Sequence, residues 1–323
     1  MRTAGLRAGR GAENCRNGLK SAFELLRISI YLKEESPREL GGIVLIDIKG
    51  LRLAFGEKVV FDDVGCLIGE RARMGLVGNN GAGKTTLLRV LMGEIEPDGG
   101  RVERSRGLKV GYLPQDLVEL EPVPVLDLLK ERVGLAGLEA RLRETELALS
   151  RTDEGDRGLG GLLDEHSRLE RHFEHLGGFG FEAAALKVLR GLGFAQEDGA
   201  RNCSEFSGGW KMRIAMAALL LSVPDVLLLD EPTNHLDVYY QLEILDLIRS
   251  AGVSCLVVMH DLNLAAQHCD RLYVMHDGRV VAGGRPRDVL TPELIRRVYR
   301  VEGEVTTAPD GAPHVLFLRT IKP

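Results

Sequence analysis

The sequence has no apolar run long enough to cross a membrane. Runs such as residues 226–229 stop at a charge or a proline, whereas a spanning helix needs about 18 to 20 apolar residues. A net charge of −5 gives no general attraction to anionic lipid or nucleic acid, so direct DNA binding is not expected. Any membrane role would therefore act through a partner, with the protein cytoplasmic or peripheral at the inner face of the cell membrane.

Cysteines are few and show no pairing pattern. The five cysteines are Cys15, Cys66, Cys203, Cys255 and Cys269, and no two have C-x-x-C spacing. This scatter indicates buried thiols in a reducing compartment rather than a disulfide framework or a metal site.

A glycine-rich segment at residues 78–86 carries the strongest signal. Its residues, Gly78, Asn79, Asn80, Gly81, Ala82, Gly83, Lys84, Thr85 and Thr86, match the P-loop pattern G-x-x-x-x-G-K-[ST]. Such a loop turns backbone N–H groups around a phosphate chain, and the following helix presents its positive end to the same anion. Lys84 can reach the β- and γ-phosphates, and the Thr85 hydroxyl can ligate Mg²⁺. The segment predicts binding of a nucleoside triphosphate.

Two carboxylates follow a buried strand. Residues 226–229 form a continuous apolar run, typical of a parallel strand buried on both faces, and Asp230 and Glu231 come next. One acid can hold hydrated Mg²⁺ while the other polarises the attacking water, and we assign these tasks to Asp230 and Glu231 in that order. A second strand at residues 253–259 ends at His260. Because no second P-loop occurs, the chain holds one nucleotide cassette.

The remaining segments predict a helical region and a strand-rich C-terminal part. Residues 126–176 are almost all helix formers, with leucines at three- and four-residue steps on both sides of a charged turn at 151–161. We interpret them as a helical hairpin. Near the C-terminus, Asp277-Gly278 is a strong hairpin signal, and residues 292–299 read as a helix.

The first 43 residues differ from the rest in composition. They are rich in Arg, Gly and Glu and lack sustained periodicity. We interpret them as a disordered extension or as a wrongly assigned start. In the second case, residues 40–44 would be an in-frame translation of a purine-rich ribosome-binding site with the real start at the valine codon of Val44, and a chain starting at Val44 would be fully active.

Taken in order, the motifs resemble the nucleotide-binding domain of the ATP-binding cassette (ABC) superfamily. The residues that carry this resemblance are Phe55, residues 78–86, Gln115, Ser207-Gly208-Gly209, Asp230-Glu231, Asp237 and His260. It covers residues 44–323 as one domain, with a helical subdomain at 120–205 that includes the hairpin and a C-terminal extension at 285–323. The resemblance implies an α/β P-loop NTPase fold: a mixed-sheet ATP-binding core, an antiparallel β subdomain and an enlarged helical subdomain.

The resemblance also implies roles within one cassette. Phe55 would stack on the adenine, and Gln115 would sense Mg²⁺ and couple to the helical subdomain. Glu231 would be the catalytic base and His260 the switch on the γ-phosphate. Lys84 and Gln115 would join Glu231 and His260 in the catalytic set. Thr85 and Gln115 would accompany Asp230 at Mg²⁺.

A single cassette of this family does not complete its own site. By resemblance, Ser207, Gly208 and Gly209 would cap the γ-phosphate bound by a neighbouring cassette, and Asp237 lies in the loop that crosses this interface. A homodimer, or a heterodimer with another cassette, is implied. ATP would hold the dimer together and hydrolysis would release it.

Within the superfamily the sequence resembles two groups. Trp210 after Ser-Gly-Gly, the string at residues 230–237 and the long gap between Gln115 and Ser207 resemble ABC-F proteins, soluble cassettes that act on ribosomes. The segments at 260–266, 277–284 and 290–294 are instead similar to the ATPases of iron-siderophore, haem and cobalamin importers.

Two functions follow. One is the energy-coupling ATPase of a transporter, with a permease docking near Gln115. The other is a ribosome-associated regulator of translation or antibiotic resistance, with the hairpin as its arm. A recombined hybrid gene, functional or not, is a third interpretation. A DNA-repair ATPase with a long coiled coil is disfavoured because the insertion is too short. The lone cassette and its importer-like C-terminal part favour the transporter, although the sequence does not name the solute.

Overall fold

The computed structural model describes residues 43–115, 120–153, 156, 158–234 and 236–321. The predictions for the N-terminal extension therefore lie outside the described residues, apart from Ile43. The described chain forms two compact units, one of residues 120–223 and the other of residues 43–115 and 224–321.

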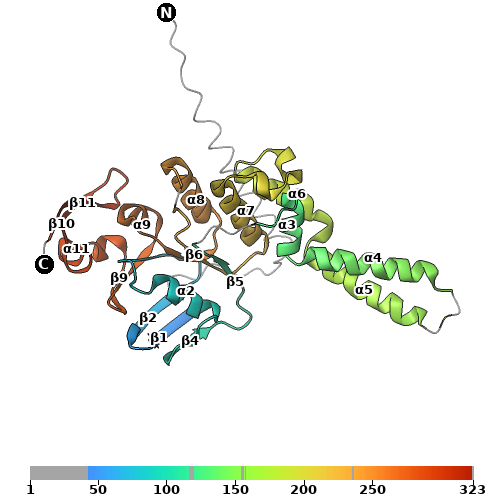
Figure 1. The fold of residues 1–323 in the computed structure, drawn as a ribbon, viewed down its shortest axis with the longest axis horizontal. Coiled ribbons are helices and arrows are strands. Elements are labelled where there is room, and N and C mark those ends of the chain that lie inside the picture. Colours follow the sequence, from blue (N-terminus) through green and yellow to red (C-terminus); the bar gives the residue numbers. More distant parts are fainter. Residues whose placement is uncertain (1–42, 116–119, 154–155, 157, 235, 322–323) are drawn as a thin grey trace, which may run out of the picture. The chain divides into compact units, whose positions relative to one another are not determined.

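The larger unit is built on a six-stranded mixed sheet (Figure 1). Its strands, in spatial order, are β5 (Val110–Leu113), β6 (Val226–Asp230), β7 (Ser254–Val258), β3 (Arg73–Gly78), β8 (Arg271–His276) and β9 (Arg279–Gly284). The pairs from β5 to β8 are parallel, and β9 is antiparallel to β8. Every residue of β6 and β7 is buried, which explains the continuous apolar run at residues 226–229 and the mainly apolar sequence of β7.

Five helices belong to the same unit: α2 (Lys84–Met92), α8 (Val238–Ser250), α9 (Leu262–His268), α10 (Pro286–Val289) and α11 (Pro292–Tyr299). In α2 the residues Leu87, Leu88 and Leu91 are buried at helical spacing and join the core cluster of the sheet. The helix that follows the P-loop is thus anchored on its apolar side.

Two antiparallel sheets complete this unit. The first has the order β2-β1-β4 and consists of β1 (Val44–Phe55), β2 (Lys58–Gly69) and β4 (Gly99–Arg104). The second pairs β10 (Val301–Thr307) with β11 (Pro313–Thr320). The six-stranded mixed sheet, the antiparallel sheet β2-β1-β4 and the helical unit confirm the predicted α/β P-loop fold class.

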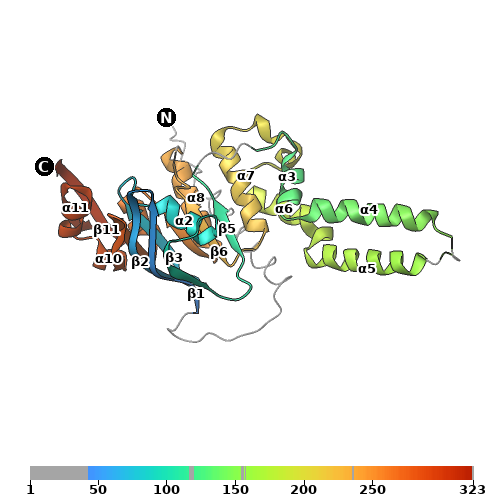
Figure 2. The ribbon, with the colours of Figure 1, turned by 60° about the horizontal axis from the view of Figure 1, so that its bottom comes forward.

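The smaller unit is helical. Its elements are α3 (Val125–Arg132), α4 (Leu135–Arg151), α5 (Leu159–His175), η1 (Gly178–Gly180), α6 (Phe181–Gly191), η2 (Gln196–Ala200), η3 (Cys203–Glu205) and α7 (Gly208–Leu221). Helices α4 and α5 run side by side as a pair (Figure 2). Leu169 and Thr145 are buried between them, and the Thr145 hydroxyl donates to the Leu142 carbonyl. The subdomain boundaries inferred from the sequence stay a prediction.

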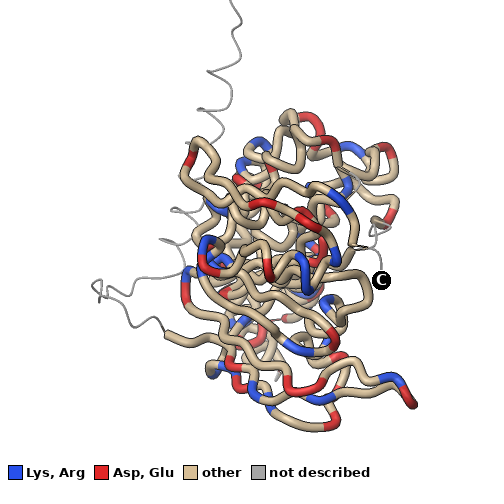
Figure 3. The backbone as a smooth tube through the Cα atoms, turned by 90° about the vertical axis from the view of Figure 1, so that its left-hand side faces the viewer, with Lys and Arg blue, Asp and Glu red and all other residues tan. Residues whose placement is uncertain are grey.

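The hydrophobicity of the helices, the cysteines and the distribution of charge (Figure 3) match what the composition predicts. Within the described ranges, no helix is both long and apolar enough to cross a bilayer. The four described cysteines are free and buried. Figure 3 shows Lys and Arg interspersed with Asp and Glu along the chain.

Candidate nucleotide site

The P-loop lies between β3 and α2, and two of its glycines cannot be replaced without a clash. Gly78 has φ of +148°, and a Cβ there would lie 2.2 Å from the carbonyl oxygen of the buried Met275. Gly83 has φ of +96°, and its Cβ would lie 2.8 Å from the ring of Phe61 on β2. The sheet and the β1–β2 hairpin therefore pack directly on the loop.

Lys84 is held inside the curve of this loop. Its Nζ donates to the carbonyls of Gly78 at 3.0 Å and Asn79 at 3.1 Å. Burial lowers the pKa of this ammonium from its ordinary value, while Glu231 and Asp230 oppose the change. The cation is thus placed between the loop backbone and two carboxylates.

Asp230 ends β6 as a fully buried carboxylate. Burial raises its pKa, and the facing Thr85 hydroxyl and the cations of Lys84 and Arg89 partly counter this rise. Neither carboxylate oxygen has a hydrogen-bond partner of normal geometry in the described part of the chain. Because an unsatisfied buried carboxylate is costly, it needs a cation or donors from outside the chain.

These groups fit a magnesium ion that shares its ligands with a phosphate. Mg²⁺ is usually held by one or two carboxylates, waters and substrate phosphates, and Asp230 with Thr85 supplies such a partial set. The described residues include no cluster of three or more His, Cys, Asp or Glu that would cage a metal alone. The arrangement therefore suits an ion that arrives with a nucleotide.

Glu231 is fixed through both carboxylate oxygens. His260 Nε2 shares a hydrogen bond with Oε1, and the Asn234 side chain donates to Oε2 at 2.5 Å. The residue is buried and has φ of +49°, a left-handed conformation that costs energy outside glycine and is concentrated at functional sites. The bend after β6 therefore turns Glu231 toward the end of β7, where His260 lies.

Asn234 is a site residue that the sequence interpretation missed. It lies three positions after Glu231 in a turn closed by its own backbone N–H, which donates to the Glu231 carbonyl at 3.0 Å. The available signal was its place in the string at 230–237, but no pattern there indicates where its side chain points.

Three other predicted residues lie at the ends of elements. Phe55 is 54 % exposed at the end of β1, in the hairpin whose Phe61 packs against Gly83. Gln115 is exposed just after β5, and Asp237 is the exposed N-cap of α8. Among residues with described side chains, no hydrogen bond joins these three to the Lys84, Asp230 and Glu231 cluster.

Ser207, Gly208 and Gly209 form the start of α7 in the helical unit. Ser207 is the exposed N-cap, so the first N–H groups of α7 are free to bind an anion. Behind them, Trp210 packs edge-on against Phe194 with ring centres 4.7 Å apart. These contacts support the helix N-terminus from within its own unit.

The fold and these side chains define a P-loop nucleotide-binding protein, and comparison with known proteins identifies its family. The family model described as "ABC transporter" matches residues 61–234. The chain belongs to this family and, like its members, is an ATP-binding protein.

Its relatives include members of both groups that the sequence resembles. The hemin import ATP-binding protein HmuV of Bordetella avium is 34 % identical over 274 residues, which cover 81 % of this chain and 95 % of that protein. ABC transporter F family member 5 of Arabidopsis thaliana is 33 % identical over 70 % of this chain but 33 % of its own length. The tylosin resistance protein TlrC of Streptomyces fradiae is 39 % identical over 59 % of this chain and 35 % of its own length.

Solved structures agree on the fold. A chain described as "An inward-facing conformation of a putative metal-chelate type ABC transporter" matches 85 % of this chain with a TM-score of 0.63 at 18 % identity. An ATP-binding cassette in its ADP conformation matches 79 % with a TM-score of 0.55 at 22 % identity. Both predicted resemblances are confirmed. The match covers 95 % of the hemin import protein but only 33 % of the ABC transporter F family member, which supports the transporter ATPase over the ABC-F alternative.

Proposed function

We propose that this protein hydrolyses ATP to ADP and phosphate as the energy-coupling subunit of an importer of the metal-chelate class. The observation that carries the chemistry is Glu231, with both oxygens held by His260 and Asn234, directly after the unpartnered carboxylate of Asp230. The importer class is supported by the match to 95 % of HmuV, whose name states hemin import.

Thr85 and Asp230 would hold Mg²⁺, with Gln115 reaching the ion from the end of β5. When bound, the ion neutralises charge on the β- and γ-phosphates. Lys84 would exchange its contacts with the loop carbonyls for phosphate oxygens, which is a short movement because Nζ already lies within the loop. The N–H groups of residues 78–86 would surround the phosphate chain, and Phe55 would stack on the base.

Glu231 would orient the attacking water and accept its proton, and His260 would contact the γ-phosphate. The hydrogen bond between them links the two tasks, because His260 leaves Glu231 when it turns toward phosphate. Asn234 would keep the carboxylate in position during that exchange. The left-handed backbone at Glu231 is costly by itself, so the contacts with His260 and Asn234 would hold it in place.

The second half of each site would come from a second cassette. Ser207, Gly208 and Gly209 offer free helix N–H groups for the γ-phosphate of a partner, and Asp237 would lie at the same interface. We propose a homodimer that closes on ATP and docks on a membrane permease near Gln115.

The hairpin argues against a ribosomal role. Helices α4 and α5 carry seven acidic and five basic side chains. The acidic ones are Glu139, Glu144, Glu146, Asp164, Glu165, Glu170 and Glu174, and the basic ones are Arg141, Arg143, Arg151, Arg168 and Arg171. Two of the arginines already bind glutamates within the pair. An arm that binds ribosomal RNA needs excess positive charge to meet phosphate, and this pair does not have it.

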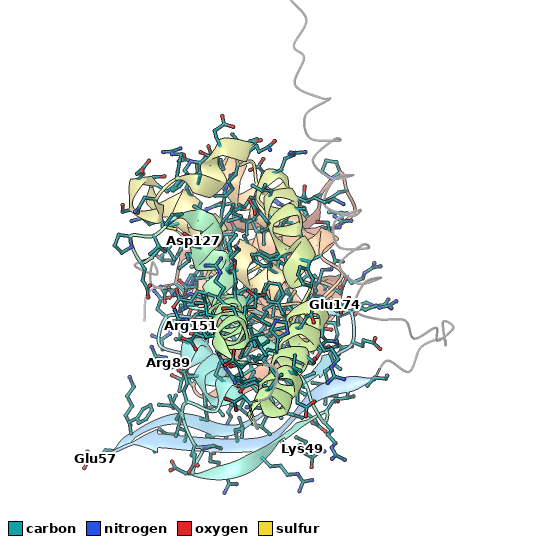
Figure 4. The ribbon with its side chains drawn as sticks, turned by 90° about the vertical axis from the view of Figure 1, so that its right-hand side faces the viewer. Lys49, Glu57, Arg89, Asp127, Arg151 and Glu174 are labelled. Atoms are coloured by element: carbon teal, nitrogen blue, oxygen red, sulfur yellow. The ribbon has the colours of Figure 1, made fainter. Side chains whose placement is uncertain are left out.

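The decisive experiment is Glu231→Gln. Loss of a general base lowers a rate by about 10²- to 10⁴-fold, so ATP hydrolysis should fall by that order while ATP binding remains. With MgATP the variant should elute as a dimer in size-exclusion chromatography with light scattering. Glu174→Gln, an exposed substitution on α5 (Figure 4), is the matched control and should hydrolyse ATP normally.

Two outcomes would contradict the proposal in different ways. A Glu231→Gln protein that stays monomeric with bound ATP would overturn the composite site. A trapped dimer that co-sediments with ribosomes from a cell lysate, and not with membranes that contain a permease, would overturn the transporter.

A further inference from the structure

The side chain of Asn79 reaches out of the P-loop to the C-terminal part of the chain. Its backbone carbonyl serves the loop by accepting from Lys84 and from the Ala82 N–H. Its Nδ2, however, donates to the carbonyl of Val298 at 2.6 Å, in the last turn of α11. Carbonyls in the last turn of a helix have no partner within the helix, so Asn79 completes the end of α11.

A second side-chain amide binds the same C-terminal part. Asn263 on α9 donates to the Val315 carbonyl at 3.2 Å and accepts from the Val315 N–H at 2.7 Å. In this way it pairs with β11 as a neighbouring strand would. Four residues further along α9, Gln267 donates to Asp310 at 2.8 Å. Figure 1 shows α9 beside β11.

The helix α9 begins directly after His260. Its N-cap is Asp261, whose carboxylate accepts from the N–H groups of Asn263 and Leu264 at 2.8 and 3.0 Å. The position of His260 therefore depends on where α9 begins, and Asn263, in the first turn, binds that start to β11.

We name residues 292–321 the C-terminal module, and several contacts make it one body. Leu294, Ile295 and Val298 of α11 are buried, and α11 packs on β10. Strands β10 and β11 pair along their length, and the N–H of residue 321 donates to the carbonyl of residue 300. Glu302 accepts from Arg319 at 2.6 Å across the two strands.

We infer that the C-terminal module is a brace that fixes the P-loop and His260 relative to each other, with Asn79 and Asn263 as its positioning residues. The inference rests on the proposed function, since it takes residues 78–86 as the phosphate loop and His260 as the γ-phosphate contact. When Lys84 turns to phosphate, the Asn79 carbonyl loses the hydrogen bond from Lys84, and any shift of Asn79 reaches α11 through its side chain. The module then passes this shift from α11 through β11 to Asn263 and α9.

Hydrogen–deuterium exchange with the full chain and the magnesium complex of a non-hydrolysable ATP analogue tests this brace. In the parent protein the analogue should slow exchange in residues 78–92 and also in 292–299 and 313–320. In Asn79→Ala the slowing should be confined to 78–92. The Kd for the analogue should rise about 3- to 10-fold, the worth of one or two lost hydrogen bonds.

Two further variants separate the brace from a general loss of stability. Asn263→Ala should keep the response of 292–299 and of 313–320 but lose the slowed exchange that the analogue gives α9, residues 262–268, in the parent protein. This variant tests the second contact even if Asn79→Ala folds poorly. Thr306→Ala is the matched control, because its hydroxyl bonds the His314 carbonyl within the module and touches neither contact. It should leave both the Kd and the exchange pattern unchanged.

The outcomes distinguish the brace from the proposed function. If the parent protein does not bind the analogue, the proposed function fails. If it binds without any change in 292–320, or if Asn79→Ala keeps both the parent Kd and the slowed exchange of the module, the brace is wrong.

Discussion

At the scale of single residues, the buried carboxylate of Asp230 lowers the stability of the nucleotide-free fold. This carboxylate has no hydrogen-bond partner of normal geometry among the described residues, and burial raises its pKa while the facing Thr85 hydroxyl opposes that rise. An unsatisfied buried polar group lowers the free energy of unfolding by about 1–3 kcal/mol. The Lys84 ammonium and the Thr85 hydroxyl reduce this cost by stabilising the charged carboxylate. The carboxylate is therefore retained for the ion it would bind.

We expect Asp230→Asn to make the nucleotide-free protein more stable by about 1 kcal/mol at pH 7, while ATP hydrolysis is lost. The sign follows from the raised pKa, because the folded state binds the Asp230 proton more tightly than the unfolded state. The cost of ionising Asp230 is then present at neutral pH and disappears below the ordinary Asp pKa, where both states are protonated. Urea unfolding at pH 7 and at pH 3.5 measures this difference.

The gain in stability from Asp230→Asn should shrink toward zero at the lower pH. Asp225→Asn is a control of a different kind: its carboxylate accepts from the Lys109 N–H at 2.8 Å, so that substitution should destabilise the fold. A destabilised Asp230→Asn protein at neutral pH would show that Asp230 has stabilising partners that outweigh its burial.

At the scale of elements, helices α4 and α5 pack mainly on each other, and of their large apolar residues Leu135 and Leu169 are buried while Leu147 and Leu163 are exposed. We expect replacement of residues 135–175 by a short Gly-Ser linker to leave ATP binding and the ATP-dependent dimer of Glu231→Gln intact. The ends of the pair lie close together because the two helices are antiparallel and of equal length (Figure 2). Nucleotide titration and light scattering check this.

Loss of the dimer on removing the hairpin would show that α4 and α5 take part in cassette pairing. The matched control is Thr145→Ser, which keeps the hydroxyl that bonds the Leu142 carbonyl inside the pair. It should behave as the parent protein in both measurements.

Elements with strong local signals could be predicted from the sequence. The continuous apolar run at residues 226–229 and the mainly apolar segment at 253–259 indicate the buried strands β6 and β7. Asp277-Gly278 indicates the β8–β9 hairpin, and both of its residues have the positive φ that such a turn needs, 45° and 69°. By contrast, β10 was missed, because Val301–Thr307 is mostly polar and half exposed and has no apolar face to reveal it.

Candidate site residues could be predicted from the sequence where they belong to a motif of adjacent residues. Residues whose role depends on a contact with a distant part of the chain could not. The P-loop, Asp230 and Glu231 follow from residues adjacent in sequence. Asn79 meets Val298 across 219 positions, and Asn263 meets Val315 across 52. A side-chain amide can bond any nearby carbonyl, so only the folded backbone shows which one it finds.

At the scale of the whole molecule, the proposed dimer predicts complementation between two inactive chains. Lys84→Ala removes the phosphate contact of one half-site, and Ser207→Arg blocks the helix N-terminus of the other. Each homodimer should be inactive. A mixed dimer of the two would contain one site with an intact loop and an intact Ser207.

Mixing the two variants in equal amounts should therefore restore up to about a quarter of the parent ATPase rate, since a symmetric dimer has two equivalent sites. Steady-state phosphate release against mixing ratio measures it, with Lys84→Ala mixed with itself as the baseline. No recovery in a verified mixed dimer would mean that each chain completes its own site, or that the two sites act only together.

The aromatic support behind the start of α7 has one more consequence. Trp210 is the chain's single tryptophan and lies next to Ser207, Gly208 and Gly209, edge-on to Phe194. Excitation at the red edge of the protein absorption band therefore gives fluorescence from Trp210 alone. The unmodified protein thus contains its own optical probe, so stopped-flow emission can follow the helix N-terminus on each turnover without an added dye.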